Sequence, residues 1–194
     1  MDSVPAEQHR FDDKLLRLSS EMDAFEGYQD THARRMAALA DQIASAFNIA
    51  DHDRFFLQQA ALVHDIGEMQ MNRGYVRMTT SLTAEQRIDL QRHPVIGEQV
   101  TAKYGLSRAV QLIVRWHHEW WNGSGYPDGL SAEQIPLAAR ILRVADTYAT
   151  LISARPYRSA LTPENARRYL TEWAGIEFDP AVVKAFLALK PPTD

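Results

Sequence analysis

The chain has 194 residues, of which 45% are hydrophobic and 24% are charged, a composition that suits one globular domain with a sizeable core. The formal net charge of −4 argues against a general attraction to nucleic acid or to an anionic membrane. The absence of cysteine excludes disulfides, zinc–thiolate sites and thiol nucleophiles.

The sequence also gives no sign of a membrane span or a secretion signal. No apolar run approaches the length of about 20 residues that crosses a bilayer. Residues 1–11 carry acidic side chains and lack the apolar stretch of a signal peptide. We therefore expect a cytoplasmic protein that has no membrane partner.

Apolar residues recur at helical spacing along most of the chain. The pattern is found over residues 33–47, 53–63, 110–116 and 135–152. Between the second and third of these, residues 67–81 begin with glycine and are largely polar, which predicts a loop. Strand signals are nearly absent, so the predicted fold is all-α.

Several helix starts carry a recognisable cap. Thr83 and Ser131 are each followed three residues later by glutamine, which is a capping-box pattern. Thr162 and Asp179 each precede a proline, which is favoured in the first turn of a helix. Residues 120–129, with the sequence WWNGSGYPDG, contain three glycines and a proline and predict a long loop.

Five of the seven histidines lie on or at the end of predicted helices. Two others, His9 and His52, have polar surroundings and no suitable partner pattern. The five histidines of interest are His32, His64, His93, His117 and His118. A single histidine in an apolar helix is usually a core or surface residue, and one HD dipeptide is weak evidence.

Two acidic residues strengthen the case for a metal site. Asp65 follows His64 in an apolar stretch, and Asp146 interrupts the apolar helix RILRVADTYATLI. A buried carboxylate is costly unless it is paired or coordinates a metal. Helix bundles build metal sites from side chains on facing helices, and histidine with carboxylate suits Fe, Mn, Zn or Co. Together with the histidines, the two acids predict a site for two divalent cations.

The stretch HHEWWNGSGYPDGL, residues 117–130, resembles the HD-GYP family, a branch of the HD phosphohydrolases. The stretches LVHDIG, HPVIGEQV, ARILRVADTYATL, RPYRSAL and FDPAVVKAF also match in family order, so the resemblance covers residues 27–187. It implies an all-α HD-superfamily bundle with a metal site in its core. We expect this domain over residues 27–190, with a helical extension over 1–26 and a tail over 191–194.

The resemblance implies a bacterial signalling enzyme, a metal-dependent phosphodiesterase that hydrolyses cyclic di-GMP or a related cyclic dinucleotide. The metal ligands it implies are His32, His64, Asp65, His93, His117, His118 and Asp146. Asp65 would be the catalytic residue and would bridge two metals. His32, His64 and Asp146 would complete one site, and His93, His117 and His118 the other.

The resemblance also implies cofactors and partners. The metals would be two divalent ions, iron or manganese, with zinc, nickel and cobalt as alternatives. Tyr126, Arg155 and Arg158 fall where the family contacts substrate phosphates, and arginine suits that task because its fork binds two oxygens. The expected partners are a cyclic dinucleotide and, in addition, a second copy of the chain or a signalling protein.

Three positions depart from the family pattern. Glu68 stands where many members carry lysine, and Ala149 where many carry aspartate, so the rate of catalysis, or activity itself, is in question. Tyr28 stands where members with three metals carry glutamate, which favours two metals. Two alternatives therefore stay open: a metal-containing module that binds a nucleotide with little or no turnover, and a hydrolase for another phosphorylated small molecule.

Overall fold

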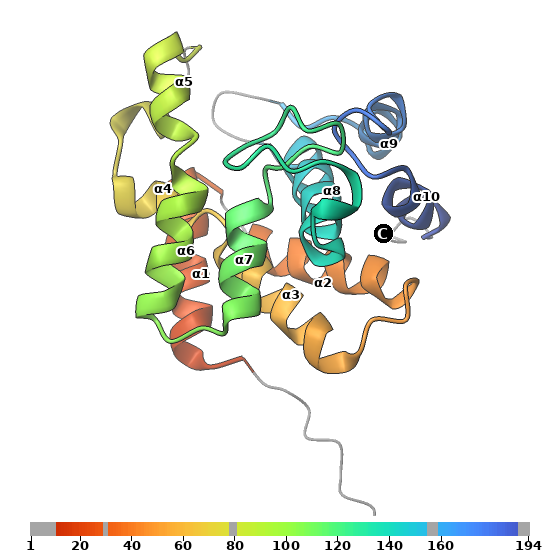
Figure 1. Ribbon diagram of the computed structural model, residues 1–194. Coiled ribbons are helices and arrows are strands. Elements are labelled where there is room, and N and C mark those ends of the chain that lie inside the picture. The colour runs from red at the N-terminus through yellow and green to blue at the C-terminus, as the bar shows by residue number, and fades with distance from the viewer. Residues whose placement is uncertain (1–10, 29–30, 78–80, 155–158, 190–194) are drawn as a thin grey trace, which may run out of the picture.

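The computed structural model describes residues 11–28, 31–77, 81–154 and 159–189 (Figure 1). The helices within these ranges are α1 (Asp13–Glu26), α2 (His32–Ser45), α3 (Asp51–Val63), α4 (Ile66–Met71), η1 (Gly74–Arg77), α5 (Ala84–Leu90), α6 (His93–Lys103), α7 (Arg108–Trp116), η2 (Ala132–Gln134), α8 (Leu137–Ile152), α9 (Pro163–Glu172) and α10 (Pro180–Ala188). The only strand-like pairing in the described part is an isolated bridge between Ala174 and Phe178. The predicted all-α fold is confirmed.

The helices enclose one apolar core, to which α2, α3, α7 and α8 contribute (Figure 1). Helix α6 packs against α4 and α7, and α9 and α10 pack against α8. Helix α5 stands apart at the top of Figure 1 and buries none of its side chains. Among the described helices, none has the length and apolar character that a membrane crossing requires.

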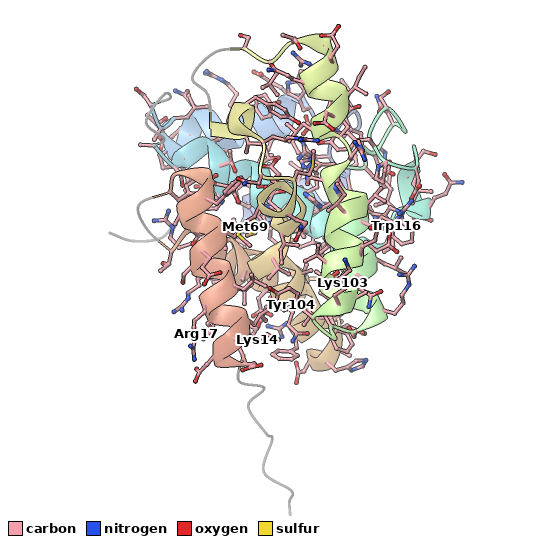
Figure 2. All side chains as sticks on the ribbon, turned by 90° about the vertical axis from the view of Figure 1, so that its left-hand side faces the viewer. Lys14, Arg17, Met69, Lys103, Tyr104 and Trp116 are labelled. Carbon is pink, nitrogen blue, oxygen red and sulfur yellow. The ribbon has the colours of Figure 1, made fainter. Side chains whose placement is uncertain are left out.

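Helix α1 belongs to the same core. Its residues Leu15, Leu18 and Met22 are buried, and the helix contacts α2, α3 and α4. Figure 2 shows Lys14 of α1 beside Tyr104, which follows α6, and the Lys14 ammonium lies 4.8 Å from the centre of that ring. The residues of α1 thus help to fix α3 and α4, the two helices that flank His64 and Asp65.

All four predicted caps are present. Thr83 and Ser131 form capping boxes, and the side chains of Thr162 and Asp179 cap α9 and α10. The expected helix start at Ile135 was wrong, because α8 begins at Leu137. Ile135 precedes a proline and is extended, with ψ of 123°, as the clash with the proline ring favours.

The loop expected from Gly67 onwards was also wrong at its beginning. Residues 66–71 form α4, and Gly67 lies inside this helix. A Cβ atom on Gly67 would stand 2.0 Å from the carbonyl oxygen of His93, at the start of α6. The glycine is therefore placed for close contact between two helices, which brings His93 next to the His64–Asp65 pair.

Candidate metal centre

The centre of the site is the carboxylate of Asp65, which lies between α3 and α4. Its Oδ2 atom is 3.1 Å from Nε2 of His64, the residue that directly follows α3. Its Oδ1 atom is 3.1 Å from Nε2 of His93 and 3.3 Å from Nε2 of His117. The two oxygens of one carboxylate therefore face separate histidines, which come from the ends of three helices.

These three histidines are oriented in the same way. Nδ1 of His64 lies 3.1 Å from the carbonyl oxygen of Ala61, and His93 and His117 make the corresponding contacts of 2.8 Å and 2.7 Å, each with the residue three positions earlier. A carbonyl oxygen can only accept, so each Nδ1 carries a proton and donates it. In the neutral ring the lone pair is then on Nε2, the atom turned toward Asp65.

This donor set suits a bound cation. A neutral ring in this tautomer turns the lone pair of Nε2 toward a carboxylate oxygen, and two facing acceptors repel, so protons on the rings or a bound cation must balance Asp65. Nε2 of His93 and Nε2 of His117 are also only 3.5 Å apart. Metal-bound histidines in proteins typically donate their second ring N–H to a carbonyl or carboxylate, as these three do. The residues therefore fit divalent metals.

Electrostatics in the cluster show the cost of leaving it without a cation. Burial lowers the pKa of His64, but the carboxylates of Asp65 and Asp146 outweigh that effect and raise the pKa to about 10. Burial and the neighbouring histidines lower the pKa of His117, although Asp65 opposes them. His64 therefore holds a proton more tightly than a free histidine, and His117 holds one less tightly. The Asp65 carboxylate attracts positive charge, but several positive rings at this short spacing repel one another.

Asp146 and His118 complete the wall of the cluster. Oδ1 of Asp146, on α8, is 3.7 Å from Nε2 of His64 and accepts a hydrogen bond of 3.2 Å from Thr150. His118 follows α7, and one ligand atom from each of Asp65, His93, His117 and His118 lies within 4.8 Å of the others. Nδ1 of His118 is 3.0 Å from Nη1 of Arg143.

His32 lies on the Asp146 side of the site. It is the first residue of α2, is 1% exposed, and its ring is stacked on Tyr28 with the centroids 3.7 Å apart. The Tyr28 hydroxyl is 3.2 Å from Oγ1 of Thr150, which in turn donates to Asp146. Ser153 Oγ is 3.5 Å from Nδ1 of His32. Tyr28 and Thr150 therefore link His32 to Asp146.

Tyr126 covers the His118 side. Its ring stacks on His118 with the centroids 4.8 Å apart and lies 6.2 Å from the ring of His93. Gly125 makes this approach possible, because a Cβ atom there would stand 2.2 Å from the Trp120 nitrogen. The structure thus brings one expected substrate-binding residue to the cluster. The other two, Arg155 and Arg158, lie outside the described residues.

Three residues of the site were not predicted from the sequence. Glu119 is 2% exposed, and its carboxylate accepts from the backbone N–H groups of Asp128, at 2.7 Å, and Leu130, at 3.0 Å, so it anchors the 120–129 loop. Arg143 and Glu177 form a buried ion pair beside His118. The signal for Arg143 was its position three residues before Asp146 in an apolar helix, which places both on one face.

A family model described as HD domain matches residues 18–182 of the chain. The chain belongs to this family, in its HD-GYP branch. Over 183 residues it is 35% identical to the cyclic di-GMP phosphodiesterase response regulator RpfG of Xanthomonas campestris, covering 93% of this chain and 48% of that protein. Over 196 residues it is 32% identical to the 3'3'-cGAMP-specific phosphodiesterase 3 of Vibrio cholerae, covering 98% and 42%.

A solved HD structure has the same fold. The cyclic GMP-AMP specific phosphodiesterase V-cGAP3 of V. cholerae superimposes with a TM-score of 0.71 at 20% identity, covering 90% of this chain and 47% of the other. The chain thus spans less than half the length of each of these HD relatives. The HD-GYP resemblance seen in the sequence is confirmed.

Glu68 and Ala149, two positions that depart from the HD-GYP pattern, lie in different surroundings. Glu68, on α4, is close enough to act on the cluster: burial lowers the pKa of His93, and the carboxylates of Asp65 and Glu68 outweigh it and raise that pKa. Ala149 instead lines a cavity of about 330 Å³ between α2, α8 and α10, which Arg35 also lines. Of the two, Glu68 acts directly on the electrostatics beside the expected metal ligands.

Proposed function

We propose that the chain is a metal-dependent phosphodiesterase that hydrolyses cyclic di-GMP or a related cyclic dinucleotide. The observation that carries this is the convergence of three buried Nε2 atoms on the two oxygens of Asp65. Support comes from sequence relatives named as phosphodiesterases of cyclic di-GMP and of 3'3'-cGAMP. The expected action in the cytoplasm stays a prediction.

Two divalent metals, iron or manganese, would be held on either side of Asp65. One would take His32, His64 and Asp146, and the other His93 and His117, with Asp65 between them. His118, the seventh expected ligand, lies in the same cluster. Bound there, the metals would activate a water and neutralise charge on the phosphoryl oxygens.

The protein's own groups would orient the site and its substrate. The carbonyl oxygens before His64, His93 and His117 fix their rings, so little reorganisation is needed when an anion arrives. Burial raises the pKa of Tyr126, so its hydroxyl keeps its proton and can donate to a phosphate oxygen. For Arg155 and Arg158, a phosphate-binding role rests on the family resemblance alone.

Hydrolysis assays on a panel of cyclic dinucleotides test this function. The purified chain, loaded with Mn(II) or anaerobically with Fe(II), is incubated with cyclic di-GMP, 3'3'-cGAMP and cyclic di-AMP, and products are separated by chromatography. We expect hydrolysis of at least one, and a lower rate in Tyr126→Phe with unchanged metal content. A chain that keeps its metals and hydrolyses none of the three would refute the proposal.

The position of Glu68 favours one alternative, a module that binds a cyclic dinucleotide without turnover. A carboxylate that acts on His93 also repels an approaching phosphodiester. We expect Glu68→Lys to raise kcat, with Glu85→Lys on the exposed helix α5 as a control of equal charge change. Binding without turnover in the native chain, together with turnover in Glu68→Lys, would favour the alternative.

A further inference from the structure

Arg143 is a largely buried cation that directly contacts two of the expected metal ligands. It lies on α8, and its side chain is 15% exposed. Its Nη1 atom is 3.0 Å from Nδ1 of His118 and 3.6 Å from Oδ2 of Asp146, while its Nη2 atom donates to Glu177. Its Nε atom is buried without a hydrogen-bond partner. A guanidinium is thus built into the wall of the metal centre.

Glu177 fixes the guanidinium in this place. Its side chain is 4% exposed, and its residue is held from both sides: its own N–H donates to the Trp173 carbonyl, and its carbonyl accepts from Trp121, each at 3.0 Å. If Arg143 moved away, the Glu177 carboxylate would be left buried without its cation, which is strongly unfavourable. Arg143 is therefore anchored where it meets His118.

The contact with Arg143 decides where the proton of His118 sits. A guanidinium has donors only, so Nδ1 of His118 must accept, and in the neutral ring the proton is on Nε2. His93 and His117 have the opposite arrangement, since their Nδ1 atoms donate to carbonyl oxygens. In neutral His118, therefore, the lone pair on Nδ1 is occupied by the hydrogen bond from Arg143, and Nε2 carries the proton. To bind a metal it would have to release Arg143.

This inference rests on the metal centre proposed above. We propose that Arg143, held in place by Glu177, keeps His118 from acting as a metal ligand. The second metal is then held by Asp65, His93 and His117. His118 instead presents an Nε2–H donor beside the metals, which suits an anionic phosphate oxygen. Arg143 and Glu177 are positioning residues, because they act through His118.

A double-mutant cycle on metal binding tests this. Arg143→Met with Glu177→Gln removes both charges of the pair, so neither is left buried alone and the net charge is unchanged. Binding of Mn(II) is measured by calorimetry, with and without His118→Ala, in both backgrounds. We expect His118→Ala to change the affinity for the second Mn(II) by less than about threefold in the native background. In the paired variant, where His118 is released, we expect a loss of at least about tenfold.

A matched pair on the same helix controls for the loss of a buried ion pair. Arg140, one turn before Arg143, has its Nη1 atom 2.5 Å from Oδ2 of Asp179, and its side chain is also 15% exposed. Arg140→Met with Asp179→Asn is expected to leave the effect of His118→Ala small. An equal, large effect of His118→Ala in every background would overturn the inference while leaving the metal centre intact. A native chain that binds no Mn(II) would overturn the proposed metal centre itself.

A second measurement needs no substitution at Arg143. In the metal-free native protein, nitrogen-15 NMR of the imidazole rings distinguishes Nδ1–H from Nε2–H. We expect the Nε2–H tautomer for His118, assigned by its loss in His118→Ala. Finding Nδ1–H in His118 would contradict the inference, whatever the fate of the paired variant.

Discussion

Tyr28 stacks face to face on His32, with the ring centroids 3.7 Å apart and the planes 6° apart. The same tyrosine reaches Thr150, and through it Asp146. Removing the ring should therefore loosen two expected ligands of one metal at once. We expect Tyr28→Ala to weaken metal binding by about 10-fold to 100-fold, the usual cost of losing a residue that orients ligands.

Tyr28→Phe is the matched control, since it keeps the stack and removes only the hydroxyl. Its loss of affinity should be clearly smaller. Mn(II) titration by calorimetry measures both variants. Equal affinity in Tyr28→Ala and the native chain would mean that His32 needs no support from the stack.

Gly67 provides a test of how α4 and α6 form the site. Gly67→Ala would place a methyl group 2.0 Å from the His93 carbonyl oxygen, so α6 must shift. We expect a loss of about 2–3 kcal/mol in the free energy of unfolding and a lower metal content. Gly74→Ala, where nothing lies within 4 Å, should change neither. Denaturant unfolding and metal analysis check both, and a stable, fully loaded Gly67→Ala would contradict this packing.

Local signals in the sequence were sufficient for most helices. Thr83, Thr162 and Asp179 act through groups two or three residues away, so their caps could be predicted from neighbouring residues. The spacing around Gly67 could not give α4, because a glycine in a polar stretch reads as a loop. What requires a glycine inside α4 is the close approach of His93, which is distant in the sequence.

The sequence was enough to predict which residues form the site, but not how all of them are arranged. Family motifs brought out the histidines and Asp65, and the structure brings three of those histidines to its carboxylate. The buried pair of Arg143 and Glu177 could not be foreseen, because the partners are 34 residues apart and come from different elements. Only tertiary packing places a guanidinium against His118.

Glu119 should matter for the fold of the 120–129 loop and not for metal binding. Its carboxylate accepts from two backbone N–H groups, which Glu119→Ala would leave without that partner. We expect a loss of about 2–3 kcal/mol in the free energy of unfolding. Metal content in the folded variant should match that of the native chain. A variant that keeps its stability but loses metal would make Glu119 a ligand instead of an anchor.

Metal binding should release protons at neutral pH. In the metal-free chain the pKa of His64 is raised to about 10, because the carboxylates of Asp65 and Asp146 outweigh burial, so His64 is protonated at pH 7. A bound metal needs the neutral ring, so proton and metal compete. Affinity should therefore rise between pH 6 and 8, about tenfold per pH unit for each proton released.

His64 and Asp65 should also make the free energy of unfolding of the metal-free chain depend on pH. The raised pKa of His64 stabilises the fold below the unfolded value of about 6.5, and this contribution is lost as the pH rises through about 10. The lowered pKa of Asp65, where the surrounding histidines outweigh burial, stabilises the fold above the unfolded value of about 3.9 and is lost in acid. For metal binding, calorimetry in buffers of different ionisation enthalpy counts the protons that each bound metal releases. A metal affinity that does not change with pH would contradict the competition between metal and proton at His64.

The metal content of Asp65→Ala tests the central claim most directly. Both oxygens of Asp65 face histidines, so its removal should disrupt both metal positions together. Elemental analysis should find about two metals per native chain. It should also find about two in Asp51→Ala, a substitution of an exposed aspartate, and none in folded Asp65→Ala. Two metals retained in Asp65→Ala would contradict a metal centre built on this carboxylate.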